Sequence, residues 1–269
     1  MNLHVFNTGH GFCAYLVADN NNVMLFDCGH DDEVGFRPSK RLPALDCNGI
    51  ETLVVTNYDE DHVSDLANLR QALSIQVLRR NRSITLEQLE KLKLEGGPLG
   101  PGMKALLAMM ERYRCDCVTP PEYTGLEFKF FCNSYPTFTD TNNLSLVAFI
   151  HCAGCSIIIP GDLGQLGWKE LLKNPDFVEN LKRVNVFVAS HHGRESGYLP
   201  DVFRFCKPDV IIVSDEKIKF DTQEVDYAKH ASGIRDRETG GTHYVLTTRK
   251  HGDLVIQSSG GEWLVHRAY

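Results

Sequence analysis

The stretch VTNYDEDHVSDL, residues 55–66, places three carboxylates and a histidine in four consecutive positions directly after an apolar, strand-like run. These residues are Asp59, Glu60, Asp61 and His62. Crowded carboxylates repel one another, and partial burial adds a desolvation cost, so a positive partner is expected beside them. The N-terminus of a following helix supplies part of that positive charge, and a bound cation could supply the rest.

The composition is that of a globular protein with a substantial core. The chain has 269 residues, of which 42% are hydrophobic and 23% are charged. Its formal net charge of −7 argues against a general attraction to nucleic acid or anionic membranes, although the basic run RRNR at 79–82 could bind phosphate or form a solvated turn. The first residues lack the charged and apolar regions of a secretory signal, and no apolar run approaches the roughly 20 residues that span a bilayer. We therefore expect a cytoplasmic protein without a membrane segment.

The nine cysteines are spread through apolar, strand-like segments rather than arranged as a disulfide framework. Free thiols in a reducing compartment are therefore expected. Two close pairs, Cys115 with Cys117 and Cys152 with Cys155, could in principle build a zinc site. The first pair is too tight for a zinc knuckle, and a hairpin turn at 153–154 explains the second pair better.

The order of strand-like and helix-like segments predicts two sheets. Alternating or wholly apolar runs typical of strands occur at 3–8, 12–18, 22–27, 51–57, 75–80, 126–133, 144–152, 155–162, 184–193, 210–215, 243–248, 253–259 and 262–268. Helices are predicted at 62–72, 84–94, 103–113, 167–174, 199–206 and 222–232. Ser83 or Thr85 would cap the second of these helices, and a loop is expected at 28–50. Strand meanders with interspersed helices in both halves, without a linker between them, indicate an α+β fold with two face-to-face sheets and outer helices, in a single domain over 1–269.

Polar residues recur where three of the apolar strands end. The acidic run follows one strand, Asp162 follows a second, and His191 with His192 follows a third. Each motif alone has a simpler explanation: an acid-rich helix N-terminus, a helix cap, and a histidine pair of no special role. Their coincidence at three strand ends, which can converge on one edge of a sandwich, favours a metal site.

The residues also resemble a known family. The segments NTGHGFCAYLV, VMLFDCG, VTNYDEDHVSDL, TNNLSLV, IIIPGDLG and VASHHGRESG occur in this order. They are similar to the metallo-β-lactamase fold, and within it to the branch typified by the cytoplasmic hydrolase domain of the DNA-uptake protein ComEC. The similarity extends over nearly the whole chain, to the tail VLTTRKHGDLVIQ. It implies a four-layer αββα sandwich with a metal site along one edge.

The resemblance implies roles for particular residues. The implied metal ligands are Asp59, Asp61, His62, Asp162 and His191, with Asp162 shared between two metal positions. His192 would contact the substrate or support the ligands, and Asp61 would orient the attacking water and accept its proton; these two are the candidate catalytic residues. Supporting or substrate-contacting roles fall on Asp27, Asn142, Asn143, Ser145 and Arg194.

Position 57 departs from the family pattern, because it is Asn where most relatives have His. An amide oxygen is a poor zinc ligand beside an imidazole, so the first metal position should be weakened or lost. His10, His30 or His243 could compensate, or could be ordinary loop histidines. The remaining three carboxylates and two imidazoles suit one or two divalent ions, Zn²⁺ or Mn²⁺. Such an ion would lower the pKa of a bound water and polarise the scissile phosphoryl or carbonyl group.

Three functions remain open from the sequence. The first is a metal-dependent phosphodiesterase or nuclease that acts on nucleic acid or a nucleotide. It is favoured by the resemblance, by the oxygen-rich site, and by Arg194 together with Lys250 or Arg249 in loops near the expected edge. The second is a hydrolase of a small ester, thioester or lactone, since fold alone does not fix the substrate. The third is a non-catalytic binding module, for which Asn57 is the main support.

Overall fold

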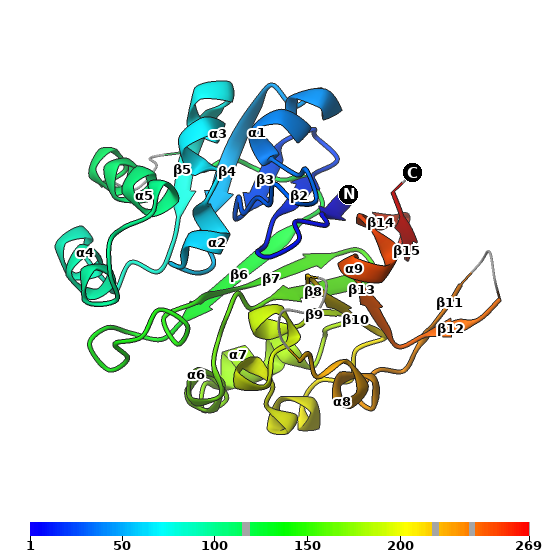
Figure 1. Ribbon diagram of the computed structural model, residues 1–269. Helices are drawn as coiled ribbons and strands as arrows, with labels where there is room; N and C mark the ends of the chain where they lie inside the picture. Colours follow the sequence, from blue (N-terminus) through cyan, green and yellow to red (C-terminus); the bar gives the residue numbers. More distant parts are fainter. Residues whose placement is uncertain (115–118, 217–220, 237–239, 269) are drawn as a thin grey trace.

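Two mixed sheets lie face to face in the computed structural model, which describes residues 1–114, 119–216, 221–236 and 240–268 (Figure 1). The first sheet has the order β15 (Glu262–Arg267), β14 (Leu254–Ser259), β1 (Asn2–Val5), β2 (Ala14–Val17), β3 (Val23–Phe26), β4 (Gly49–Val54) and β5 (Ser74–Arg79). The second has the order β13 (Val245–Thr247), β10 (Val210–Val213), β9 (Val186–Val188), β8 (Cys155–Ile159), β7 (Leu146–Cys152) and β6 (Glu127–Cys132). A two-stranded ribbon joins β11 (Ile234–Arg235) to β12 (Thr242–His243).

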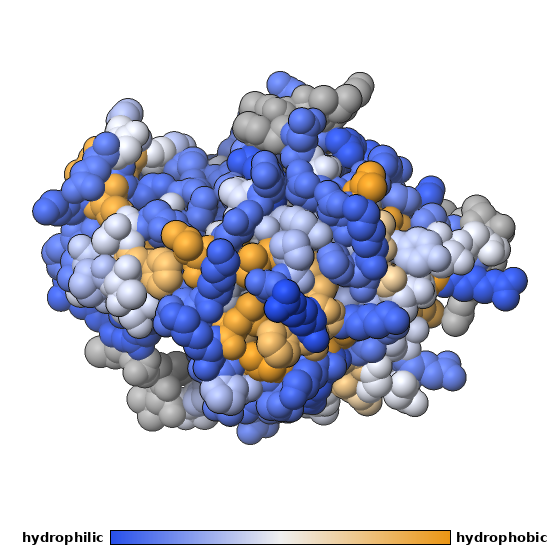
Figure 2. All heavy atoms as spheres, turned by 90° about the horizontal axis from the view of Figure 1, so that it is seen from below, coloured by the Kyte–Doolittle hydropathy of each residue, from blue (hydrophilic) through white to orange (hydrophobic). Residues whose placement is uncertain are grey.

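Helices cover the outer faces of both sheets. Those beside the first sheet are α1 (Pro38–Arg41), η1 (Pro43–Leu45), α2 (Glu60–Val63), α3 (Leu66–Ala72), α4 (Leu86–Glu95) and α5 (Pro101–Arg112). Those of the second half are α6 (Gln165–Leu171), α7 (Pro175–Leu181), η2 (Ser190–Gly193), η3 (Glu195–Gly197), η4 (Pro200–Arg204), α8 (Glu224–Ala228) and α9 (Thr248–His251). Figure 2 shows the molecule from below, the side on which α6, α7 and α8 lie in Figure 1; this face is mostly hydrophilic, with an apolar area near its centre.

Three buried cores separate the layers, and strand periodicity explains them. Successive strand residues point to opposite faces of a sheet. In β8, Ile157 and Ile159 therefore join the core between the sheets, whereas Ile158 joins the core beneath the second helix layer. In β2, Leu16 faces the inner core and Tyr15 faces the first helix layer. The arrangement is a four-layer αββα sandwich, which confirms the predicted fold class.

Several local predictions need correction. The predicted helix 62–72 is two helices, α2 and α3, because Asp65 between them is fully buried and accepts a hydrogen bond from the Ser39 backbone at 2.8 Å. Helix α7 was not predicted, although Asn174 caps it by accepting hydrogen bonds from the Asp176 and Phe177 amides. The expected loop 28–50 contains α1 and η1.

Other local predictions are confirmed. Thr85, rather than Ser83, caps α4, and it forms a capping box with Gln88. Residues 153–154 form the predicted turn between β7 and β8. Cys152 and Cys155 lie opposite each other in the register of the two strands. The seven described cysteines are free thiols, and the pair Cys115 and Cys117 lies outside the described residues. Within the described chain, no helix combines the length and apolar character needed to cross a membrane.

The strand ends that carry the polar motifs meet at one edge of the sandwich. Strand β4 of the first sheet leads into the acidic run, while β8 and β9 of the second sheet lead into Asp162 and the histidine pair. The two sheets are joined here by a hydrogen bond of 2.7 Å from the Leu146 amide to the Thr56 carbonyl. This junction positions the candidate site.

Candidate metal centre

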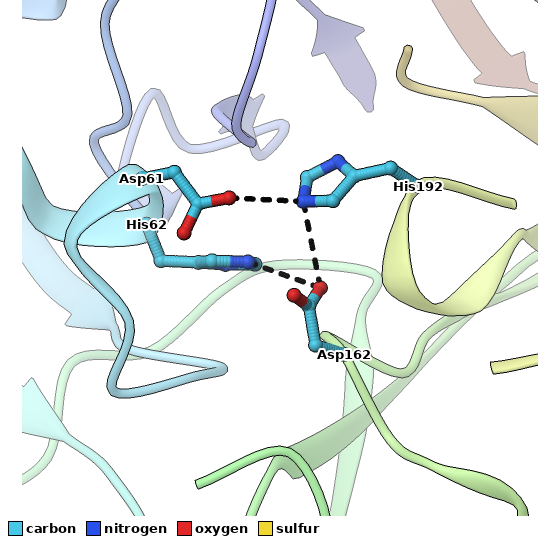
Figure 3. A group of neighbouring side chains, drawn as sticks. All are labelled: Asp61, His62, Asp162 and His192. Atoms are coloured by element: carbon cyan, nitrogen blue, oxygen red, sulfur yellow. Dashed lines mark ion pairs between the residues drawn. The ribbon is translucent and has the colours of Figure 1, made fainter. Parts of the chain in front are cut away.

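Four side chains from the two sheets converge at this edge: Asp61, His62, Asp162 and His192 (Figure 3). One potential ligand atom from each lies within 4.8 Å of the others. His62 Nε2 is 3.0 Å from Asp162 Oδ1, and His192 Nε2 is 3.3 Å from Asp61 Oδ2 and 3.6 Å from Asp162 Oδ1. We call these four residues the DHDH cluster.

Both histidines of the cluster are oriented by an oxygen on their far side. His62 Nδ1 lies 2.7 Å from the buried Asp27 carboxylate, and His192 Nδ1 lies 3.0 Å from the Ser214 carbonyl oxygen. A carbonyl oxygen only accepts, so Nδ1 of His192 carries a hydrogen, and Nε2 is the atom that presents a lone pair when the ring is neutral. Carboxylate and carbonyl partners of this kind typically orient metal-bound histidines.

The donor atoms of the cluster fit a divalent metal ion. His62 Nε2 and His192 Nε2 are buried and make no hydrogen bond of good geometry among the described residues, although carboxylate oxygens lie 3.0 to 3.6 Å away. A buried polar atom without a well-formed hydrogen bond is costly. Both atoms face carboxylates in Figure 3. Two imidazole nitrogens and two carboxylates are suitable ligands for Zn²⁺ or Mn²⁺.

Protonation of the metal-free cluster follows from its charges. Burial disfavours the charged histidines, but Asp162 and Asp27 raise the pKa of His62 well above its ordinary value, and Asp162 and Asp61 raise the pKa of His192. Burial also disfavours the charged carboxylates, but the histidines hold the pKa of Asp61 and of Asp162 below the ordinary range. The metal-free cluster therefore holds protons in the place that a cation would take.

The three adjacent carboxylates of Asp59, Glu60 and Asp61 each have a different partner. Asp59 Oδ1 accepts hydrogen bonds from Lys93 Nζ at 2.6 Å and from Thr141 Oγ1 at 2.8 Å. Glu60 accepts from the amides of Gly102 and Met103, in the first turn of α5, at 2.6 and 3.0 Å. Asp61 alone of the three joins the cluster, so the acidic run is distributed among a lysine, a helix N-terminus and the metal centre.

Close backbone packing sets the position of Asp61. Gly11 has a φ of +126°, and a Cβ at Gly11 or at Gly29 would collide with the Asp61 carbonyl oxygen. The NTGHGF motif therefore needs glycine for contact with the acidic loop.

The histidine loop has a left-handed backbone. His191 and His192 have φ values of +51° and +54°, a conformation that L-residues adopt at a cost. It sends the two neighbouring side chains in different directions.

The structure departs from the sequence-based assignment of the two histidines. His192 belongs to the DHDH cluster, whereas His191 was expected as the ligand and lies farther out, with Nε2 3.8 Å from Asp162 Oδ2. Its Nδ1 is 2.7 Å from Ser196 Oγ. Asp59 was also expected as a ligand, but its carboxylate lies against Lys93 instead. Sequence order alone cannot distinguish adjacent histidines, because the backbone conformation decides which one points inward.

Asn57 holds loops together. Its Nδ2 donates to Asn142 Oδ1 and to Ser145 Oγ, both at 3.1 Å, and its Oδ1 accepts from the Asp59 amide at 2.7 Å. Ser145 Oγ in turn accepts from the Asp162 amide at 3.2 Å. Asn57 therefore positions the loops that carry Asp61 and Asp162 and is not part of the DHDH cluster.

The other candidate residues lie around the cluster or away from it. Asp27 is fully buried and also accepts hydrogen bonds from the Thr56 amide and hydroxyl. Asn143 bonds to Asp140 and to the Gly167 amide, and so fixes the loop before β7. His30 contacts Ser64 and His243 contacts Asp236, both outside the cluster.

His10 and Arg194 lie at the mouth of the cluster. His10 Nε2 is 3.5 Å from Asp61 Oδ2. Arg194 Nη1 is 3.2 Å from His191 Nε2, and its Nη2 is 3.5 Å from His10 Nδ1. Burial lowers the pKa of both His10 and His191, which favours neutral rings beside the guanidinium.

Comparison with known proteins shows the family of the chain. The family profile described as "Metallo-beta-lactamase superfamily" matches residues 13–186. The chain belongs to the metallo-beta-lactamase superfamily of metal-dependent hydrolases. It is 24% identical over 179 residues to ComE operon protein 3 of Bacillus subtilis (strain 168), an alignment that covers 65% of this chain and 22% of that protein. The chain thus spans about a fifth of the length of this curated relative.

One solved structure supports the fold, and a second is similar over most of the chain. A mutant of the CmlA beta-hydroxylase superposes with a TM-score of 0.53 and 12% identity, covering 96% of this chain and 54% of that one. Igni18, a metallo hydrolase from the archaeon Ignicoccus hospitalis, matches with a TM-score of 0.49 and 13% identity, over 96% of this chain and 100% of that chain.

Proposed function

We propose that the protein is a metal-dependent phosphodiesterase that acts on a nucleotide or nucleic acid substrate. The observation that carries the proposal is the Arg194 guanidinium at the mouth of the DHDH cluster, between His191 and His10. Arginine keeps its charge at any physiological pH and matches the geometry of phosphate oxygens. A phosphodiester brings a negative charge to this position, whereas a neutral ester or lactone does not.

The roles of the cluster residues follow from their exposure. A divalent ion held by Asp61, His62, Asp162 and His192 would supply an acidified water and offset charge on the phosphoryl group. Among the four side chains, Asp61 is the most accessible at 20%, against 1%, 4% and 6% for His62, Asp162 and His192. Asp61 is therefore placed to accept a hydrogen bond from the attacking water and orient it, while Arg194 binds the phosphoryl oxygens.

Substitution of Arg194 tests the proposal. The protein loaded with Mn²⁺ or Zn²⁺ is assayed with bis(p-nitrophenyl) phosphate and with p-nitrophenyl acetate. Arg194→Gln should lower kcat/KM for the phosphodiester at least tenfold without changing the metal content, and His192→Ala should abolish both metal binding and turnover. Arg204→Gln is the matched control, because Arg204 is 77% exposed and pairs with Asp201. Turnover of the acetate ester alone, or wild-type phosphodiesterase activity in Arg194→Gln, would contradict the proposal.

A further inference from the structure

We infer that the substrate is a small phosphodiester with one phosphate at the DHDH cluster and an uncharged, hydrogen-bonding group, such as a nucleobase, in an adjacent groove. This inference rests on the proposed function and specifies its substrate class. It excludes polymeric nucleic acid as the preferred substrate. Three features of the structure carry it: the position of the groove, its charge, and its hydrogen-bonding groups.

The groove lies beside the cluster, next to His191, and has the size of one small ligand. Its volume is about 440 Å³, and His191 lies in its wall. Since His191 Nε2 is 3.8 Å from Asp162 Oδ2 and 3.2 Å from Arg194 Nη1, a phosphate at the cluster mouth would place its substituent in this groove. Pockets of roughly 300–1,000 Å³ hold ligands of nucleotide size.

The groove has the wrong charge for a second phosphate. Its charged side chains are the exposed carboxylates of Asp140 and Glu195, and the described residues that line it include no lysine or arginine. A phosphate next to either carboxylate would be repelled. The part of the substrate that occupies the groove therefore carries no negative charge.

Three other cations near the site form ion pairs with carboxylates. Lys93 Nζ is 2.6 Å from Asp59, and Lys250 Nζ is 2.6 Å from Glu224. Arg249 Nη2 lies 3.2 Å from Asp215 and 3.5 Å from Glu224. Arg249 and Lys250, which the sequence placed in loops near the expected edge, are therefore paired with carboxylates of the protein itself.

The basic run 79–82 is also engaged within the protein. The Arg79 guanidinium stacks 4.6 Å over the Phe130 ring, Arg80 donates to the Ile84 carbonyl, and Arg82 donates to the Arg114 carbonyl. A nucleic acid strand needs several phosphate-binding cations along its path. The described surface around the cluster offers Arg194 at its mouth and carboxylates beyond it.

The lining supplies what a nucleobase needs. Asn142 Oδ1 accepts from Asn57, so its amide nitrogen is the end left for a ligand. Gln165 Nε2 donates to the Glu195 carbonyl at 3.0 Å, and its amide oxygen, Oε1, is placed to accept a hydrogen bond from a ligand. Leu166 is 63% exposed and provides an apolar surface in the same wall. Proteins that hold an unstacked base form hydrogen bonds to its edge and contact its face with aromatic or apolar side chains.

Binding and salt dependence test the inference. With the Zn²⁺-loaded protein, adenosine 5′-monophosphate should bind at least tenfold more tightly than inorganic phosphate by isothermal titration calorimetry, and Leu166→Ala should remove most of this advantage. Val225→Ala, a change at another exposed apolar residue, is the matched control. Equal affinities for the two ligands in the wild-type protein would overturn the inference.

Cleavage assays separate this inference from the proposed function. The value of kcat/KM per bond should be higher for a dinucleoside monophosphate than for a 20-nucleotide single strand. For the dinucleoside monophosphate, a plot of log kcat/KM against the logarithm of the salt concentration should have a slope of about −1 or shallower, as expected for one phosphate contact. The double change Asp140→Asn with Glu195→Gln should improve the longer substrate selectively, and Glu170→Gln with Glu179→Gln serves as the control. A preference for the 20-mer with a slope of about −4 or steeper would overturn the inference and leave the proposed function intact, whereas cleavage of neither substrate would overturn both.

Discussion

His191 and His192 are adjacent in the chain, yet only His192 Nε2 belongs to the DHDH cluster. We therefore predict that His192→Ala loses the metal, while His191→Ala keeps about one ion per chain. The reason is that His192 contributes one of four donor atoms, whereas His191 lies toward Ser196 and Arg194. Metal content by inductively coupled plasma mass spectrometry of both variants, each the control for the other, decides the matter. Loss of metal in His191→Ala with retention in His192→Ala would reverse the assignment.

Asp162 faces the candidate metal centre and does not cap the following helix. The cap position of α6 is Gly164, and Asp162 instead faces His62 and His192. Asp162→Asn should therefore lose metal binding. The wild-type melting temperature should fall when chelator is added, because metal that binds only the folded state stabilises it, and the variant should barely respond. Full metal occupancy in Asp162→Asn would contradict this role.

At the scale of elements, the N-terminus of α5 binds the Glu60 carboxylate. Glu60 accepts two backbone hydrogen bonds there and places a negative charge at the positive end of the helix. Glu60→Ala should lower the free energy of unfolding by about 1 to 2 kcal/mol without changing the metal content. Urea denaturation of chelated and metal-loaded protein measures the first effect. Glu90→Ala, an exposed change on α4, should change stability little; a loss of metal in Glu60→Ala would show that Glu60 supports the cluster.

The elements also show what sequence could and could not predict. Apolar periodicity predicted the strands of both sheets, because it depends only on neighbours in the sequence. The polar motifs that follow β4, β8 and β9 then indicated that these three strand ends meet at one edge. The break between α2 and α3 was missed because it depends on a contact between Asp65 and Ser39, far apart in the chain. The pairing of Asp59 with Lys93 depends on the packing of α4 in the same way. The exchange of His191 and His192 depends on left-handed backbone angles that no residue type at these positions signals.

At the scale of the molecule, the DHDH cluster joins the two sheets. Asp61 and His62 follow β4 of the first sheet, whereas Asp162 and His192 follow β8 and β9 of the second. A divalent ion at the cluster would therefore hold together the edges of both sheets. Metal removal should consequently affect the stability of the whole sandwich rather than that of one loop.

The pH dependence of metal binding is the last prediction. In the metal-free protein, Asp162 and its neighbours outweigh burial and raise the pKa of His62 and of His192 above 6.5. A histidine whose pKa is raised by folding stabilises the fold at pH values below its ordinary, unfolded pKa. This stabilisation is lost as the pH rises through the pKa of the folded state. The melting temperature of the chelated protein should therefore fall as pH rises above about 6.5, and that of the loaded protein should fall less.

The same protons should be released when metal binds at pH 7, so the affinity for metal should rise with pH. Calorimetric titration with Zn²⁺ in buffers of different ionisation enthalpy counts the protons released, and between one and two are expected from the two histidines. The His191→Ala variant should release the same number of protons as the wild type, because the pKa of His191 is lowered and its ring is neutral before metal binds. Metal uptake without proton release would show that His62 and His192 are already neutral in the metal-free protein.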